Sequence, residues 1–305
     1  MAERDDLRID LLRQLKGLGY GFVTPGNDSH RRVVRRRGLA GDLRDVFGWN
    51  LPFRPGTVRP ELFEAMGAAG LLVRRRRYWR SALRVASLDR TLFWHSAWPP
   101  KARDAVFFGP DSYRFADFVC AELPPGPLRI ADIGTGSGVG AIAAALARPG
   151  STVLASDLNP AALELARVNA AAAGVELTLA QGSGLAPLDG QFDVIIANPP
   201  FFAGKGGRLY RDGGGDLGME VALVWAQEAA DRLAPGGRLL LYSGAPVVAG
   251  VDRLREGLER VLVPKGLVLR YREIDPDIFG GLLNHPRYWR VERIAAVGLV
   301  AERQQ

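Results

Sequence analysis

The sequence predicts an α/β fold, with a parallel sheet whose strands are joined by helices and a smaller N-terminal α+β domain. Three observations support this prediction. After residue 127, short apolar runs alternate with helical patterns, as in stacked βαβ units. A glycine-rich turn, ADIGTGSG, follows the first of these runs. Before residue 100 the pattern is irregular and rich in arginine, which indicates a separate N-terminal domain.

The apolar runs predict five strands, at residues 129–133, 152–156, 175–179, 193–197 and 238–242. Helical patterns between them predict helices near residues 139–147, 161–173 and 217–233. Asn159 and Pro160 favour a helix start, as an N-cap and a first helical residue. Two later apolar segments, 266–271 and 291–300, fit a further pair of strands.

We expect the domains to divide at residues 1–104 and 105–305. In the first part, helical patterns cover residues 7–18 and 60–69. Two or three strand-like runs follow, LLVRRRRYWRSALRVASL and TLFWHSAW. A helix followed by a hairpin is the order of a winged-helix-like module, although many small folds share it.

The composition is that of an ordinary globular protein, with 47% hydrophobic and 24% charged residues among 305. Cys120 is the only cysteine, so the chain cannot form an internal disulfide or a metal site built on cysteines. The three histidines (His30, His95 and His285) lack metal-ligand spacing, so no metal is expected. Neither a signal-peptide pattern nor a membrane-spanning apolar run is visible, so we expect a soluble cytoplasmic protein without a membrane partner.

The net charge is +7, and only four of the 40 basic residues are lysines. Two arginine clusters, RRVVRRR at residues 31–37 and RRRRYWR at residues 74–80, lie in the N-terminal part. They fit a nucleic-acid-binding appendage in which Tyr78 and Trp79 stack on bases. They fit solvated helix faces and hairpin turns equally well, so both interpretations stay open.

The turn ADIGTGSG spans residues 131–138, between a strand and a helix. Its glycines let the backbone turn sharply and approach a ligand closely, as in dinucleotide-binding domains. Asp132 precedes the first glycine, and Asp157 ends the second strand about twenty residues further on, where a carboxylate can bind both ribose hydroxyls. Taken singly, the two acids fit loop bracing and helix capping as well.

The segment FDVIIANPPF, residues 192–201, ends a strand in Asn198-Pro199-Pro200-Phe201. Together with the glycine turn, it resembles the class I S-adenosylmethionine (SAM)-dependent methyltransferases of the small-domain type, which methylate planar nitrogens. The resemblance implies a Rossmann-like seven-stranded sheet with one antiparallel strand in its closing pair. It also implies SAM as cofactor and S-adenosylhomocysteine as product. The cofactor residues it implies are Pro110, Asp111, Tyr113, Asp132, Gly134, Thr135, Gly136, Gly138, Asp157, Leu158, Gly182, Ser183 and Asn198.

The catalytic residues that the resemblance implies are Asn198, Pro199, Pro200 and Phe201. An amide or exocyclic amine is a poor nucleophile because its lone pair is delocalised. Oxygens that accept its N–H bonds stabilise the positive charge that develops during transfer. The Asn198 side chain and the Pro199 carbonyl can do this, and Phe201 can stack on a planar group. The alternative is a strand that ends in a Pro-Pro turn beside a buried phenylalanine.

The sequence departs from the family at Gln181-Gly182-Ser183-Gly184. Ser183 stands where relatives carry an Asp that contacts the adenine amino group, which suggests weaker SAM binding. The stretch AGKGGRLYRDGGGD follows Phe201. Its glycines and charges suggest a loop at the acceptor mouth, with Lys205, Arg208 and Arg211 available to an anionic substrate, although a plain solvated loop fits equally well.

Several acceptors remain open. A base in RNA or DNA is the first choice, the side-chain amide of a protein glutamine the second, and a small-molecule nitrogen the third. A SAM-binding or nucleic-acid-binding module without catalysis is the alternative from another class. The sequence leaves the oligomeric state undetermined.

Overall fold

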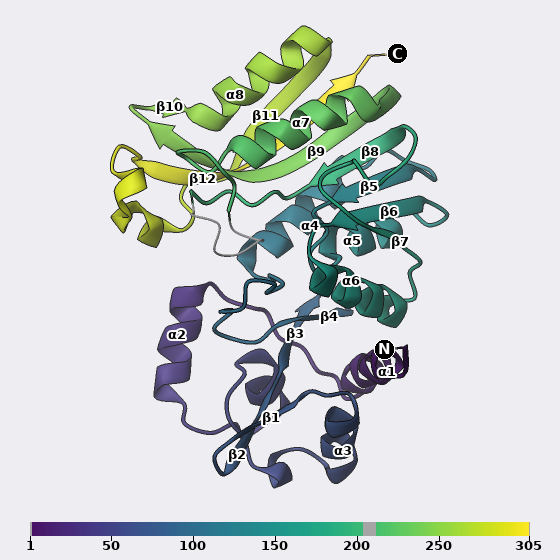
Figure 1. Ribbon diagram of the computed structural model, residues 1–305, viewed down its shortest axis with the longest axis vertical. Helices are drawn as coiled ribbons and strands as arrows, with labels where there is room; N and C mark the ends of the chain where they lie inside the picture. The colour runs from purple at the N-terminus through teal and green to yellow at the C-terminus, as the bar shows by residue number, and fades with distance from the viewer. Residues whose placement is uncertain (1, 204–211, 305) are drawn as a thin grey trace.

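The computed structural model describes residues 2–203 and 212–304 (Figure 1). Its large sheet has the strand order β11-β12-β9-β8-β5-β6-β7, and a short strand, β10, pairs with β9. The strands are β5 (Arg129–Ile133), β6 (Thr152–Asp157), β7 (Thr178–Gln181), β8 (Phe192–Ala197), β9 (Leu233–Val248), β10 (Val251–Asp252), β11 (Leu267–Asp275) and β12 (Arg293–Arg303). The predicted α/β class is confirmed.

The closing pair of strands is also confirmed. β5, β6, β7, β8 and β9 run parallel to one another, whereas β12 lies antiparallel to both β9 and β11. The reversed strand β12 is therefore the antiparallel member that the resemblance implied.

Helices cover both faces of this sheet. They are α4 (Pro110–Glu122), α5 (Val139–Ala147), α6 (Pro160–Ala173), α7 (Glu220–Arg232) and α8 (Arg253–Leu262). Alternate strand residues face opposite ways: Ile130 and Val194 pack in a cluster with α4 and α5, whereas Ala131 and Ile195 pack with α7 and α8. Both faces are thus buried, which explains why the parallel strands read as nearly continuous apolar runs.

Some expected boundaries were wrong. The third strand was expected at residues 175–179, but β7 begins only at Thr178 because Gly174 (φ +73°) ends α6 and a short connection follows. The third helix was expected at residues 217–233. Gly218 has φ +78°, so α7 starts at Glu220, and Leu233 already belongs to β9.

The N-terminal part is formed by α1 (Ala2–Gly17), α2 (Asn27–Arg36), the π-helix η1 (Arg44–Gly48), the 3-10 helix η2 (Pro55–Thr57), α3 (Pro60–Ala68), β1 (Leu72–Arg75), β2 (Tyr78–Ser81), β3 (Leu83–Leu88) and β4 (Thr91–Ser96). The two predicted helices correspond to α1 and α3. Two hairpins follow α3, one of β1 with β2 and one of β3 with β4. The first arginine cluster lies mainly on α2, a helix that the sequence pattern did not predict.

A third apolar cluster joins the N-terminal part to the sheet domain. It combines Leu11 and Leu15 of α1 and Met66 of α3 with Leu165 and Val168 of α6. Its core therefore crosses the expected division at residue 104, which itself stays a prediction.

Asn169 of α6 adds a polar connection between the two parts. Its side-chain oxygen accepts the Trp94 N–H at 2.8 Å, and its amide nitrogen donates to the carbonyls of Trp94 at 3.1 Å and Ser137 at 2.9 Å. Trp94 belongs to β4, and Ser137 belongs to the glycine turn. One buried amide thus links the N-terminal hairpin to the turn after β5.

We expect Asn169→Ala to lower the free energy of unfolding by about 2–4 kcal/mol, because buried backbone groups lose their hydrogen-bond partner. Urea denaturation followed by circular dichroism measures the change. Gln14→Ala removes an exposed amide from α1 and is the matched control, with an expected change below about 0.5 kcal/mol. An Asn169→Ala loss no larger than that of the control would contradict the structural role.

Candidate active site at the carboxyl ends of the strands

A cavity of ≈ 1040 Å³ lies at the carboxyl ends of β5, β6 and β8. Its size is at the upper end of the range for small-molecule sites. The predicted residues that line it are Pro110, Asp111, Gly134, Thr135, Gly136, Asp157, Leu158, Gly182, Ser183, Asn198, Pro199, Pro200 and Phe201. The predicted cofactor and acceptor segments therefore border one continuous space.

The glycine turn forms one wall of this cavity. The N–H groups of Gly134 and Thr135 both donate to the Ser156 carbonyl, at 2.9 and 3.0 Å. Gly134 has φ +70°, and an added Cβ would lie 2.5 Å from the Trp225 ring. At Gly136 (φ +56°) an added Cβ would have its nearest neighbour at 4.0 Å, so the space there is open cavity. The absent side chain makes room for a ligand against the backbone.

Gly138 and Asp132 lie behind the turn and are not lining residues. Gly138 (φ +81°) is the N-cap of α5, and an added Cβ would lie 3.2 Å from Ala166. The Asp132 carboxyl is buried, where it accepts the Thr135 hydroxyl at 2.7 Å and the Ala141 N–H at 2.9 Å. Burial raises the pKa of Asp132 to about 6. In this structure Asp132 braces the turn from inside.

Asp157, at the end of β6, faces the cavity from the neighbouring strand. One carboxyl oxygen accepts the Gly136 N–H at 2.9 Å and the other accepts the Asn159 N–H at 2.8 Å. Burial raises the pKa of this carboxyl. Each oxygen has a further lone pair, so Asp157 can still accept hydroxyl groups of a ligand. Asn159 caps α6 by accepting the Ala161 N–H at 3.0 Å.

The segment after β7 closes the far side of the cavity. Ser183 is exposed there, and the Ser156 hydroxyl donates to the Gly184 carbonyl at 2.7 Å. Ser183 thus lies at the cavity wall without the carboxylate that the resemblance leads one to expect.

Pro110 and Asp111 begin α4, whereas Tyr113 points elsewhere. Asp111 is only 2% exposed; one of its oxygens accepts the Tyr242 hydroxyl at 2.7 Å. Its other oxygen is buried and has no partner among the described residues. Burial raises the pKa of Asp111. The Tyr113 hydroxyl accepts the Thr24 N–H at 2.8 Å and joins α4 to the N-terminal part, so Tyr113 is not a lining residue.

The acceptor segment, residues 198–201, leaves β8 at the same height along the sheet at which the glycine turn leaves β5. Ile133 and Ala197 are paired in the parallel register, and the next residues are Gly134 and Asn198. An added Cβ at Gly244 would lie 2.5 Å from the Phe201 ring, so the ring packs closely on β9. The Ala203 N–H donates to the Tyr288 hydroxyl at 2.6 Å. Lys205, Arg208 and Arg211, expected beyond this point, lie outside the described residues.

Two groups of lining residues were not predicted from the sequence. Phe279, Gly281, Leu282 and Asn284 come from the connection between β11 and β12. The Phe279 ring lies 5.8 Å from Phe201 and 5.1 Å from Phe202, which extends the aromatic wall. The second group comes from the N-terminal part and consists of Thr24, Pro25, Gly26, Asn27, Asp28, Arg31, Arg84, Pro100 and Arg103. No local signal identifies either group, because long-range folding brings both to the cavity.

Two further searches of the described residues gave no candidate. No group of three or more His, Cys, Asp or Glu side chains there could hold a metal ion. None of the helices in residues 2–203 and 212–304 is long and apolar enough to cross a membrane.

The amino-acid sequence of the chain is similar to those of known methyltransferases. Residues 116–249 match the model of the methyltransferase small domain. The chain is 38% identical over 151 residues to the release factor glutamine methyltransferase of Neisseria gonorrhoeae, which covers 44% of this chain and 54% of that protein. It is 32% identical over 222 residues to the ribosomal protein L11 methyltransferase of Syntrophotalea carbinolica. That alignment covers 67% of this chain and 64% of the relative. The first of these alignments spans about half the relative's length.

Among solved structures, the fold is similar to that of Trm5b from Pyrococcus abyssi, with a TM-score of 0.53 and 15% identity. The alignment covers 76% of this chain and 62% of that one. At this identity the likeness concerns the fold alone.

The raised pKa of Asp132 predicts a pH effect on stability. The pKa of Asp132 in the folded protein is about 6, above its ordinary value near 3.8. The protonated carboxyl therefore contributes fully to the free energy of unfolding below about pH 4, and this contribution is lost as pH rises through about 6. Relative to Asp132→Asn, the wild-type free energy of unfolding should fall by about 3 kcal/mol over this window. Urea denaturation at several pH values measures it. A difference between the two proteins that stays constant with pH would contradict the assignment.

Proposed function

We propose that this chain is a SAM-dependent N-methyltransferase acting on a planar nitrogen; the match of residues 116–249 to the methyltransferase small domain model supports this. One observation carries the proposal. The glycine turn after β5 and Asn198-Pro199-Pro200-Phe201 after β8 leave adjacent parallel strands at one level and line the same cavity. A donor held at the first would lie beside an acceptor held at the second.

The residues on the donor side fit SAM. The open space at Gly136 admits a ligand against the turn, and Asp157 can accept the hydroxyls of a ribose. Asp111 also borders the cavity, but its carboxyl is buried, accepts the Tyr242 hydroxyl and lies 3.5 Å from the Arg114 guanidinium, so we assign it no direct contact with SAM. When bound, SAM supplies an electrophilic methyl group on a sulfonium.

On the acceptor side, the Asn198 side-chain oxygen and the Pro199 carbonyl accept hydrogen bonds from the N–H groups of the planar nitrogen. These bonds strengthen as positive charge develops on that nitrogen, so they lower the barrier. Phe201 and Phe279 hold the planar group against the cavity wall. Orientation relative to the donor supplies much of the remaining rate, and no strong general base is needed.

Two acceptor classes have specific support. An exocyclic amine of an RNA or DNA base agrees with the arginine-rich rim at Arg31 and with the aromatic wall. A protein glutamine amide agrees with the similarity to the release factor glutamine methyltransferase. Incubation with methyl-labelled SAM and cell extract, followed by nuclease or protease digestion, distinguishes them by which treatment releases the label.

We expect Asn198→Ala to leave SAM binding within a few-fold of wild type while methyl transfer falls by about 10²–10³-fold, because the acceptor loses a charge-stabilising oxygen. Calorimetry with SAM and a labelled-methyl assay measure the two effects. Asn284→Ala removes another amide from the same cavity and should change the rate far less. Equal rates in wild type and Asn198→Ala would remove Asn198 from this role.

We expect Ser183→Asp to tighten SAM binding about 2- to 10-fold, because the new carboxylate can accept the adenine amino group. Calorimetric titration with SAM measures the dissociation constant. Ser183→Asn, which adds similar volume without charge, is the control. A dissociation constant that is unchanged or weaker in Ser183→Asp would show that adenine does not reach Ser183.

A further inference from the structure

The mouth of the cavity lies between two segments that are far apart in the sequence. Asn27, Asp28 and Arg31 of α2 form one rim, and Phe279 to Asn284 form the other. A Cβ added to Gly281 would lie 4.0 Å from the Asp28 carboxyl, so the rims approach each other closely. In Figure 1, α2 and the yellow segment after β11 lie on the same side of the molecule. A substrate that enters here meets both.

The α2 rim is strongly basic. Residues 27–37 contain five arginines and one acid, Asp28. Arg31 pairs with Asp28 and Arg37 pairs with Asp45. Arg32, Arg35 and Arg36 are exposed and form no ion pair within the described part of the chain.

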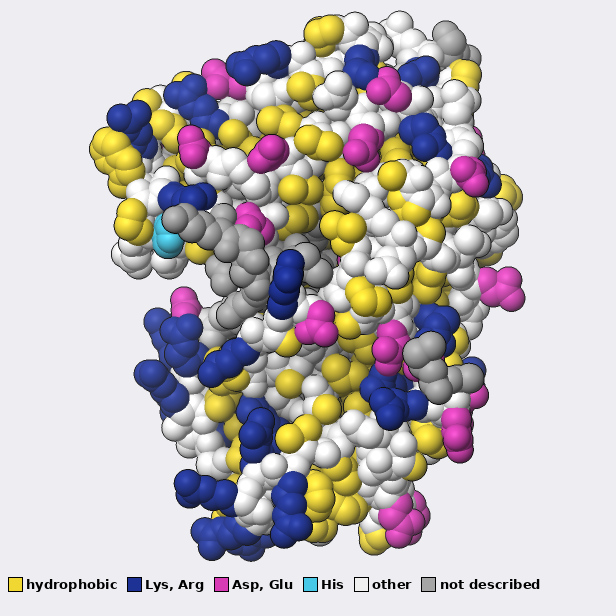
Figure 2. Space-filling model, in the orientation of Figure 1, with side chains coloured by type: hydrophobic (Ala, Val, Ile, Leu, Met, Phe, Trp, Pro, Cys, Tyr) yellow, Lys and Arg dark blue, Asp and Glu magenta, His cyan; other side chains and the backbone are white. Residues whose placement is uncertain are grey.

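The basic surface continues from α2 to the hairpin of β1 and β2. Arg74, Arg75, Arg76 and Arg77 are exposed there. Figure 2 shows Lys and Arg side chains gathered along the side of the N-terminal part that carries α2 and this hairpin. Like charges held this close repel one another, and a polyanion relieves that repulsion.

The segment that follows the opposite rim carries an exposed indole, Trp289. Trp289 is 73% exposed, and the Arg290 guanidinium lies 4.5 Å from its ring centre. The preceding residue, Tyr288, accepts the N–H of Ala203 and so touches the acceptor segment. An exposed aromatic ring beside an arginine is the arrangement on which nucleobases stack.

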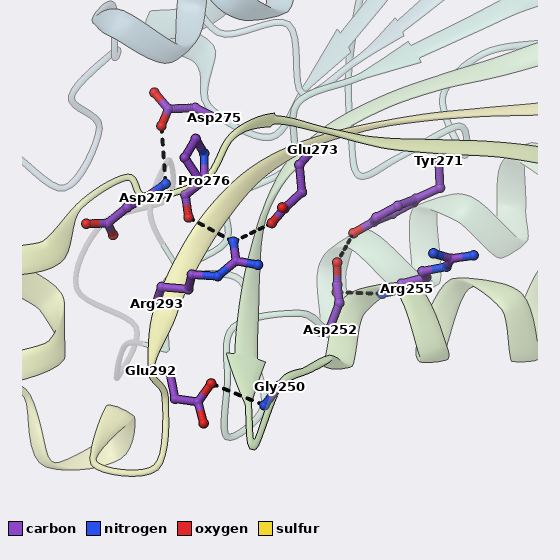
Figure 3. Close-up of polar contacts among 10 residues, drawn as sticks. All are labelled: Gly250, Asp252, Arg255, Tyr271, Glu273, Asp275, Pro276, Asp277, Glu292 and Arg293. Carbon is purple, nitrogen blue, oxygen red and sulfur yellow. Dashed lines mark hydrogen bonds and ion pairs between the residues drawn. The ribbon is translucent and has the colours of Figure 1, made fainter.

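The connection between β11 and β12, which carries both the rim and Trp289, is held in place at both ends (Figure 3). Arg293 forms an ion pair with Glu273 and donates to the Pro276 carbonyl at 2.9 Å. Nearby, the Asp275 carboxyl accepts the Asp277 N–H at 3.2 Å, and Glu292 accepts the Gly250 N–H at 3.1 Å. The indole therefore sits on an anchored segment, which lowers the ordering cost of binding.

We propose that the acceptor of the proposed methyl transfer is a base in a nucleic acid strand held between these rims. This inference rests on the proposed function. Arg32, Arg35 and Arg36 hold backbone phosphates, and Trp289 stacks on a base that neighbours the acceptor. An acidic protein would match the charge of α2 and the hairpin, but it would make no use of the exposed indole of Trp289 as a stacking surface.

The test measures binding of labelled single-stranded RNA and DNA of about 20 nucleotides by fluorescence anisotropy at several salt concentrations. For the wild type, log K should fall linearly with log salt. The α2 variant combines Arg32→Gln, Arg35→Gln and Arg36→Gln. Its slope of log K against log salt should be shallower by about two, because each phosphate contact to a single strand contributes about 0.7. Trp289→Ala should weaken binding roughly 5- to 150-fold at every salt, whereas Trp289→Phe keeps most of the affinity.

The matched control is Arg253→Gln, Arg255→Gln, Arg260→Gln on α8, which removes the same charge far from α2 (Figure 1). Its slope should equal that of the wild type. A slope of the α2 variant equal to that of the control, or unchanged affinity of Trp289→Ala, overturns the proposal.

Transfer of labelled methyl groups from SAM into cell extract tests the nucleic acid partner separately from the methyl transfer itself. Label that nuclease releases, and that falls in the α2 variant, supports the nucleic acid partner. Label on protein at equal rates in the wild type and the α2 variant overturns the partner but leaves methyl transfer intact. Failure of the wild type to bind SAM refutes the proposed function, and the salt slopes still decide whether the rims bind nucleic acid.

Discussion

The point at which the strand order reverses decides where the site lies. From β5 the chain runs outward through β6 and β7, then returns to the other flank of β5 with β8 and β9. The segments after β5 and β8 therefore diverge and leave a crevice at the carboxyl ends. Because Ile133 and Ala197 are paired, both segments begin at the same depth. Backbone pairing alone thus makes the proposed donor and acceptor sites neighbours.

The crevice is useful only if its walls keep their shape, and buried polar groups provide this. Asp132 ties Thr135 to the start of α5, and Asp157 ties the turn to the start of α6. Asn169 connects the same turn to the N-terminal hairpin. These bonds run behind or along the wall, so the side facing the ligand keeps free acceptors. Asp157 is the one of these three residues that also lines the cavity, so it both supports the wall and offers acceptor oxygens to a ligand.

The sequence predicted those parts whose causes are local. β5 and α5 were predicted with the bounds that the structure has, because an apolar run and a glycine turn mark both. α2 was missed because it carries mainly charged residues and has only His30 fully buried, so no apolar period reveals it. Asp132 was expected to bind the cofactor, which stays a prediction; its carboxyl points behind the turn and away from the cavity, and spacing along the chain does not tell on which side a carboxyl points. The rim at Phe279 depends on the pairing of β11 with β12, which no local pattern encodes.

The mouth of the cavity takes one edge from residues 24–31 and the other from residues 279–284, while the donor wall lies between them in sequence. The residues proposed to hold the donor and those proposed to hold the acceptor strand therefore come from separate stretches of the chain. The apolar cluster shared by α1, α3 and α6 and the hydrogen bonds of Asn169 hold the first edge to the sheet domain, so a different N-terminal part would have to reproduce these contacts to keep the glycine turn in place.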